Sequence, residues 1–411
     1  MRQMLYLLAA WAVLAAGVSC EKIGGGNQNN PYKALELSTK SAELARQGNT
    51  FAFEFIDRIN QAENGDFIIS PLSMQFLLGM LLDGAQGTTA EEISQVLGYG
   101  AGEVEAVNDY CLSMLEQLPS LDNKTKLSIA NAIFANKQYS ILDSYKRTVG
   151  KFYQAEVSNL DFSDGARSLK TINGWCSDKT NGMIPKVLES VSADMLSYLF
   201  NAMYFKSEWN DKFSKSETAD ETFTDESGAR RPVPMMKKQK SLTYQENDDY
   251  RVVRLKYGNG AFNMLVVLPQ TGKTLREVSA AIKASDWNEF LQTMVSCDVD
   301  LWLPKFETRY SRSLNDILSQ MGMPSSFQPG TANFKAMSDY ALCLSYVKQD
   351  AVIKVDEEGT EAAAVSHAGM LAMAVAPGEH VVFHADHPFL YLITENSTGV
   401  ILFAGKFGGK I

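Results

Sequence analysis

The chain has 411 residues, of which 45% are hydrophobic and 21% are charged, and this composition is typical of a globular protein with a substantial core. The formal net charge of −10 argues against nucleic acid as a partner, because phosphate binding needs a basic surface. Two short basic clusters, Arg230-Arg231 and Lys237-Lys238 with Lys240, are predicted to be solvated residues of a hairpin, with polyanion binding as the less favoured alternative.

The N-terminal segment has the pattern of an export signal. Arg2 precedes an apolar run, Met4–Val18, that is too short to span a bilayer comfortably, and small residues then lead to Cys20. This ending resembles the lipobox of bacterial lipoproteins, although Gly17 occupies a position where an aliphatic residue is usual. We therefore expect residues 1–19 to be a signal peptide and Cys20 to be lipidated. Ordinary signal cleavage is the alternative.

Residues 20–31 have the composition of a tether, because Gly24–Asn30 is polar and flexible. We expect an exported protein, lipid-anchored to the outer membrane on its periplasmic or cell-surface face. Beyond Pro31 the sequence contains no second linker or repeat. Residues 32–411 are therefore expected to form one domain, although single cores usually stop growing at about 250–300 residues. Four widely spaced cysteines are expected to be buried free thiols: Cys111, Cys176, Cys297 and Cys343.

Helical patterns dominate the first half of the chain. In Asn49–Asn60, apolar residues recur every four positions and would lie on one face of a helix. Ser70 followed by Pro71 favours the start of a second helix, which is predicted to continue to Leu82. A third helix is predicted around Leu169–Cys176.

The second half contains short runs rich in Val, Leu and aromatic residues, which are typical of strands. The predicted strands are Tyr250–Leu255, Phe262–Leu268, Asp298–Pro304, Val352–Val355, Phe389–Thr394 and Val400–Phe407. Helices followed by strands predict an α+β fold with a large, mostly antiparallel sheet.

A long segment separates a strand at Ala351–Asp356 from a strand at Val381–Phe383. The segment is apolar and alanine-rich, and connections of this length are usually functional or disordered. One interpretation is an exposed helix, which the helix propensity of alanine supports. The other is a strand, because small residues occupy every second position and would face one side of a sheet: Thr360, Ala362, Ala364, Ser366 and Ala368. Such a segment can be a loop in one state and an inserted strand in another.

The residues Lys354–Ala363, with the sequence KVDEEGTEAA, resemble the hinge of the serpin reactive-centre loop nearly residue for residue. Further motifs that resemble this family follow its order along the chain: Phe67–Ser73, Thr88–Ile93, Asn173–Trp175, Thr180–Ile184, Asn201–Trp209, Val233–Met236, Leu303–Phe306, His384–Leu390 and Phe403–Lys406. Each motif is weak alone, but together they extend from Tyr32 to the end of the chain. Their shared order identifies the chain as a member of the serpin family.

The resemblance implies a single serpin domain and a suicide-substrate mechanism. A serine protease would cleave the exposed loop and form an acyl-enzyme, and the freed hinge would insert into the central sheet and trap the protease. The hinge residues that the resemblance implies are Glu357, Glu358, Gly359, Thr360, Glu361, Ala362, Ala363 and Ala364. The implied partner is a target serine protease, held as a covalent acyl complex, and the protein is expected to be a monomer without a cofactor.

The reactive bond is placed by the family's nearly constant hinge length. Counting from Glu357 puts this bond between Met373 and Ala374, with Met370, Leu371 and Val375 as alternative reactive residues. Residues of these types suit chymotrypsin-like or elastase-like proteases. A trypsin-like target is not expected, because no Arg or Lys lies between Gly359 and Val382.

The resemblance also implies a shutter beneath the opening of the sheet, formed in the family by Ser, Ser, Asn and His. Ser70, Ser73 and Asn201 match, but Gln349 occupies the position of the histidine. Because Gln both donates and accepts hydrogen bonds, we expect a working but retuned shutter. Trp209 matches the tryptophan at the breach, where the sheet opens.

The four histidines suggest a metal site as an alternative function. On a helix, spacings of four and three residues would place His380, His384 and His387 on one face. Pro388 and the surrounding Val and Phe residues favour a strand and a turn instead, so no metal site is expected.

Other functions remain open at this point. Ser345-Tyr346-Val347-Lys348 matches the SxxK motif of a hydrolase, but the partner motifs are missing and we expect no enzyme activity. A serpin fold that binds without inhibiting is a second alternative, which the small hinge residues disfavour. A cross-class inhibitor of papain-like cysteine proteases is a third.

Overall fold

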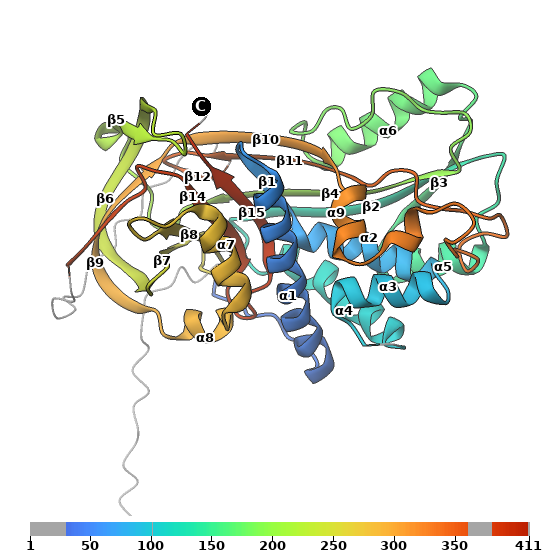
Figure 1. The fold of residues 1–411 in the computed structure, drawn as a ribbon, viewed down its shortest axis with the longest axis horizontal. Coiled ribbons are helices and arrows are strands. Elements are labelled where there is room, and N and C mark those ends of the chain that lie inside the picture. Colours follow the sequence, from blue (N-terminus) through green and yellow to red (C-terminus); the bar gives the residue numbers. More distant parts are fainter. Residues whose placement is uncertain (1–29, 101, 361–379, 410–411) are drawn as a thin grey trace, which may run out of the picture.

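The computed structural model describes residues 30–100, 102–360 and 380–409. Two β-sheets form the framework, and helices cover their faces (Figure 1). In the six-stranded sheet the order is β10 (Phe306–Ser313), β11 (Lys348–Val355), β12 (Gly359–Thr360), β4 (Ser197–Glu208), β2 (Lys126–Asn136) and β3 (Glu156–Leu160).

The second sheet has nine strands. Its order is β1 (Phe67–Ile69), β15 (Ile401–Phe407), β14 (Phe389–Glu395), β8 (Phe262–Pro269), β7 (Tyr250–Lys256), β6 (Arg230–Glu246), β9 (Val295–Pro304) and β13 (His380–His384), and β5 (Ala219–Thr224) pairs with β6. The β2–β3 and β9–β13 pairs are parallel, and the other pairs described are antiparallel. The predicted α+β fold with a large, mostly antiparallel sheet is therefore confirmed.

The helices lie mainly in the first half of the chain, as the sequence predicted. They are α1 (Thr39–Ala62), α2 (Pro71–Gly84), α3 (Thr88–Leu97), α4 (Val104–Gln117), α5 (Asp143–Phe152), α6 (Gly165–Lys179), α7 (Leu275–Ala284), α8 (Trp287–Gln292) and α9 (Asn315–Met321), with short 3₁₀ turns at Leu118–Ser120, Lys215–Glu217 and Pro324–Phe327. No helix in the described part of the chain is both long and apolar enough to cross a membrane.

Helix α2 is the central buried helix of the fold. The Ser70 hydroxyl accepts a hydrogen bond from the Ser73 backbone N–H at 3.2 Å, and Pro71 occupies the first turn, where its missing N–H costs nothing. Nearly every residue of α2 is buried, because the helix packs against both sheets. Helix α6 covers the opposite face of the six-stranded sheet, where Ile172 and Cys176 pack against Phe134 of β2 (Figure 1).

The long strands β2 and β4 were missed by the reading of the first half as mostly helical. The burial of β4 does not alternate along the strand, because α2 covers one face and α6 the other. A strand that is covered on both faces lacks the alternation of apolar and polar residues from which a strand is predicted. Helix α1 is also longer than predicted, since Ser38 caps it by accepting a hydrogen bond from the Ser41 N–H at 3.0 Å.

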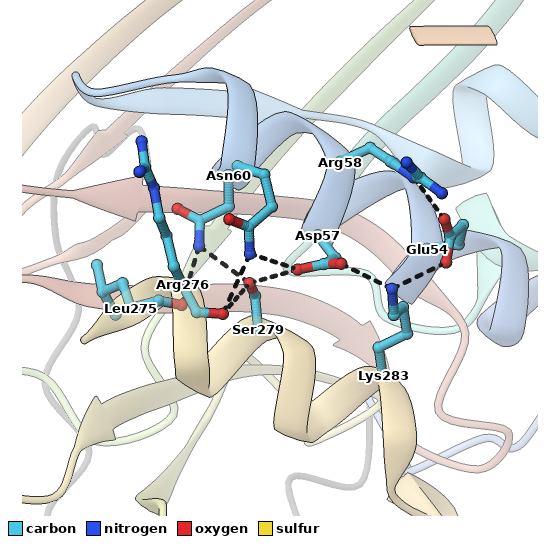
Figure 2. A network of polar contacts seen from close by, with 9 residues as sticks. Glu54, Asp57, Arg58, Asn60, Leu275, Arg276, Ser279 and Lys283 are labelled. Atoms are coloured by element: carbon cyan, nitrogen blue, oxygen red, sulfur yellow. Dashed lines mark hydrogen bonds and ion pairs between the residues drawn. The ribbon is translucent and has the colours of Figure 1, made fainter. Parts of the chain in front are cut away.

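A polar network joins α1 to α7 (Figure 2). Asp57 is buried and accepts hydrogen bonds from Lys283 and Ser279, each at 2.8 Å. The Asn60 amide donates to Ser279 at 3.0 Å. Burial acts to raise the pKa of Asp57, but hydrogen bonds from Lys283, Ser279 and Gln61 outweigh it and lower the pKa.

Candidate functional site

The predicted hinge enters the six-stranded sheet at its centre. β12 lies between β11 and β4, with Thr360 opposite Val355 on one side and opposite Ser207 on the other. The Thr360 side chain is 2% exposed, and its hydroxyl lies 2.6 Å from the Tyr257 hydroxyl in the core. The structure thus holds the start of the hinge as a short strand, while β4 and β11 continue beyond it.

The turn that leads into β12 requires glycine. Asp356 and Gly359 exchange backbone hydrogen bonds at 2.9 and 3.2 Å, which closes the turn between β11 and β12. Gly359 has φ +157°, and a Cβ at this position would overlap the backbone oxygen of Ser207 on β4. Only a residue without a side chain lets the hinge approach β4 this closely.

Two hinge carboxylates are fixed by cations. Glu357 accepts hydrogen bonds from Lys305 and from the Thr218 hydroxyl, both at 3.0 Å. Its burial acts to raise its pKa, but these and backbone hydrogen bonds prevail and lower the pKa. Glu358 pairs with Lys212 at 2.7 Å and with Lys215 at 3.1 Å, which lowers the pKa of Glu358. Both glutamates therefore hold the turn in place as anions.

Trp209 and the residues after it hold the backbone of the same turn. The Trp209 indole N–H donates to the Asp356 carbonyl, and the Trp209 backbone N–H donates to the Glu358 carbonyl, both at 2.8 Å. The Phe213 N–H donates to the Glu357 carbonyl at 3.0 Å. The indole ring also stacks on Tyr257 with a centroid distance of 4.5 Å. Three successive hinge carbonyls are thus bound by one segment of chain.

The four predicted shutter residues converge at the start of α2. The Ser70 N–H donates to the Gln349 amide oxygen at 3.1 Å, and the Gln349 amide nitrogen donates to the Ser70 carbonyl at 3.0 Å. The Ser73 hydroxyl donates to Asn201, which donates in turn to Asn131 at 2.7 Å. Gln349 of β11 and Asn201 of β4 are therefore tied to the start of α2 by separate hydrogen bonds.

A space lies between β4 and β11, which are held apart by β12 at one end. Among the strands that the structure describes, β4 and β11 pair with β12 but not with each other. A cavity of about 20 Å³ lies next to Thr360, lined by residues of β4 and β11. A larger cavity, of about 310 Å³, lies where the two strands begin, lined by Asp194–Leu199 and Tyr340–Val347. We call this space, from Thr360 to the larger cavity, the slot.

Other predicted residues fall outside the described chain. Residues 361–379 contain the hinge residues Glu361, Ala362, Ala363 and Ala364, the predicted reactive bond Met373–Ala374 and the alternatives Met370, Leu371 and Val375, and residues 1–29 contain Cys20. Their roles stay predictions.

The alternative sites differ from what their sequence patterns suggested. His380 and His384 lie on β13, not on a helix, and pair with Asp298 and Asp300 of β9. Within the described ranges, no group of three or more His, Cys, Asp or Glu residues could hold a metal ion. In the SxxK sequence, the Lys348 ammonium donates to the Val187 carbonyl at 3.0 Å and pairs with Asp350 at 2.8 Å.

Comparison with known proteins assigns the family. The family model described as "Serpin (serine protease inhibitor)" matches residues 46–408. This chain belongs to the serpin family. Serpin B6 of Macaca fascicularis is 34% identical over 373 residues, which are 89% of this chain and 98% of that protein. The leukocyte elastase inhibitor of Xenopus laevis is 33% identical over 371 residues, which are 87% of this chain and 97% of that protein.

Solved serpin structures share the fold of this serpin. The thermophilic serpin tengpin in its native state matches with a TM-score of 0.82 and 26% identity, over 93% of this chain and 97% of that chain. Thyroxine-binding globulin in complex with thyroxine matches with a TM-score of 0.79 and 27% identity, over 89% of this chain and 98% of that chain. The curated relatives are mostly protease inhibitors, whereas thyroxine-binding globulin, whose structure matches this fold, is in complex with thyroxine.

The side chains that bind the hinge were not predicted from the sequence. Lys305 lies in the Leu303–Phe306 motif, which identified the family but did not indicate that its lysine would bind Glu357. Lys212, Thr218 and Tyr257 gave no signal at all, because they come from other segments and meet the hinge only after folding.

Proposed function

We propose that this serpin inhibits chymotrypsin-like or elastase-like serine endopeptidases as a suicide substrate and not as an enzyme. The observation that carries the proposal is the register of β12, in which Thr360 is already paired with both flanking strands of the slot. Protease cleavage would release the following residues, which could then extend this strand along the slot.

The register predicts which loop residues would meet which residues of the sheet. β12 is antiparallel to β4, so each step forward in the loop is one step back along β4. Ser366 would lie opposite Asn201, and Met370 opposite Ser197, the first residue of β4. β4 is therefore long enough to pair with the loop up to Met370, and the cavity of about 310 Å³ lies at this end of the slot.

The same register supports the role of the small residues. Thr360 points to the core and Tyr257, and every second loop residue after it would point the same way. These residues are Ala362, Ala364, Ser366 and Ala368, all small, and the next one in the series, Met370, would face the larger cavity. Small residues where the slot is narrow favour rapid insertion.

Incubation of the purified full-length protein with elastase, chymotrypsin and trypsin tests the proposal. We expect elastase or chymotrypsin to form a complex that survives SDS, with release of a C-terminal fragment that mass spectrometry shows to begin at Ala374. Fragments that begin after Met370, Leu371 or Val375 would move the reactive bond but keep the mechanism. Loop cleavage without a complex and without loss of protease activity would refute inhibition of serine proteases, and papain then tests the cross-class alternative.

We also propose that the serpin is exported and tethered to the outer membrane through lipidated Cys20. The support is the sequence pattern of residues 1–31. Metabolic labelling with a fatty acid in a bacterial host should label the wild type but not Cys20→Ala. Equal labelling, or none in either protein, would contradict lipidation.

A further inference from the structure

A basic pocket lies beside the segment that holds the hinge. Its volume is about 260 Å³, and its walls come from Trp209–Asp211, β6 and β7. Four cationic side chains line it, namely Lys238 and Lys240 of β6 and Arg254 and Lys256 of β7, whereas Asp211 is the single carboxylate among the lining residues described. The chain as a whole is acidic, with a net charge of −10, so this group of cations is a local departure from the overall charge.

Lys238 is buried in this pocket, and it shares a distant carboxylate, that of Asp211, with Lys240. Its side chain is 8% exposed, its ammonium donates to the Asp211 backbone carbonyl at 2.7 Å, and the Asp211 carboxylate is 3.9 Å away. The ammonium also lies 4.1 Å from the centre of the Phe213 ring. Burial is the main cause that lowers the pKa of Lys238 to about 8, so the charge is only partly compensated.

Arg254 is the second undercompensated cation. Its guanidinium donates to the Met294 sulfur at 3.4 Å and forms no ion pair with any residue of the described chain. Burial lowers the pKa of Arg254. A guanidinium carries five N–H donors in a planar fork that matches two oxygens of a phosphate or carboxylate. The described residues therefore use only a small part of the donor capacity of Arg254.

We propose that this pocket binds a small multivalent oxyanion of the phosphate class, either free or as a sugar ester. Arg254 would bind two oxygens of the anion as a fork, and Lys238 and Lys240 would add point charges. The hydroxyls of Ser241 and Ser296, which lie on the pocket wall 2.7 Å from each other, can supply further donors. The pocket volume of about 260 Å³ accommodates a pyrophosphate or a sugar phosphate.

The location couples such a ligand to the hinge. Trp209 and Asp211 line the pocket, while Trp209, Lys212 and Phe213 bind hinge residues by the hydrogen bonds described above. An anion that orders this segment would therefore also order the turn before β12. The binding itself does not depend on protease inhibition, so it is measured in the absence of a protease.

Isothermal titration calorimetry of the full-length protein tests the proposal, with inorganic pyrophosphate and glucose 6-phosphate as separate ligands. We expect saturable binding of at least one of them. Arg254→Gln should weaken that binding about tenfold or more, and Lys240→Gln, an exposed position that folding tolerates, should weaken it less. Lys237→Gln is the matched control: it removes the same charge from the next position of β6, but Lys237 packs on Trp302 and pairs with Glu221, outside the pocket.

Binding that Arg254→Gln or Lys240→Gln weakens and Lys237→Gln preserves supports the proposal. Pyrophosphate binding alone indicates a free oxyanion, and sugar phosphate binding indicates an ester. The absence of saturable binding for both ligands would overturn the proposal. An equal loss in all three variants would also overturn it, because it would indicate a diffuse effect of surface charge.

Discussion

Replacing Thr360 by arginine perturbs the one hinge side chain that is already inside the sheet. Thr360 is 2% exposed, its hydroxyl contacts the Tyr257 hydroxyl at 2.6 Å, and the adjoining cavity holds only about 20 Å³. An arginine side chain exceeds this space, and none of the described residues that line the cavity carries a carboxylate. Burial of a charge without a partner costs about 3 kcal/mol or more.

We expect Thr360→Arg to keep β12 out of the sheet in the intact protein, so the cost has to be met during insertion, which is the step that traps the protease. If about 3 kcal/mol is added to the barrier for insertion, this step slows about 100-fold. Hydrolysis of the acyl-enzyme then outruns insertion, so we expect most Thr360→Arg molecules to be cleaved as ordinary substrate. The number of inhibitor molecules consumed per protease inactivated should rise, and the SDS-stable complex should largely disappear.

The assay is a titration of elastase or chymotrypsin, with gels that resolve complex from cleaved inhibitor. Thr360→Ser is the matched control, because it keeps the hydroxyl and the small size and should inhibit nearly as the wild type does. Circular dichroism shows whether each variant is folded. A folded Thr360→Arg protein with the stoichiometry and complex yield of the wild type would refute the assignment of β12 as the point where insertion begins.

Three further substitutions probe the hinge, the shutter and the helix pair. Gly359→Ala should release β12 from the sheet, because the new Cβ overlaps the backbone of β4. Hydrogen exchange at the backbone amides of the hinge should then accelerate. Unchanged exchange would contradict the close approach of Gly359 to β4. Gln349→Ala leaves the Ser70 backbone N–H without its partner, while the Ser70 carbonyl keeps the hydrogen bond from the Met74 N–H at 3.2 Å. The substitution should cost about 1–3 kcal/mol, measured as a lower urea midpoint, and a midpoint equal to the wild type would argue against Gln349 as a shutter residue. Asp57→Asn removes the anion that pairs with Lys283 and should lower the free energy of unfolding by about 1–3 kcal/mol at neutral pH. The pKa of Asp57 is lowered in the folded state. Its contribution to the free energy of unfolding is therefore present above the unfolded pKa and is lost as the pH falls through the folded pKa. A difference in this free energy between variant and wild type that persists below the folded pKa would contradict the pairing with Lys283.

Local patterns predicted much of the fold. Ser70 and Pro71 gave the start of α2, and the runs that became β7, β8 and β14 were recognised to within one residue at their ends. The strand β4 escaped because helices cover both of its faces and remove the alternation that marks a half-buried strand.

The part of the site that is continuous in sequence was predicted, whereas the part that combines distant segments of the chain was not. Glu357 to Thr360 form one motif, and the structure places these residues together at the breach. The cations that bind them and the basic pocket around Lys238 and Arg254 combine residues from distant strands, so only the folded chain brings them together. Gln349 illustrates an intermediate case, since its position was expected but the paired hydrogen bonds to Ser70 were not.

In the proposed mechanism the cleaved loop becomes a strand between β4 and β11. A crystal structure of the protein after cleavage in the loop would test this insertion directly. We expect a continuous strand from Gly359 to Met370, with Ser366 opposite Asn201. A cleaved protein in which these residues remain outside the six-stranded sheet, or enter it in another register, would contradict the proposed insertion.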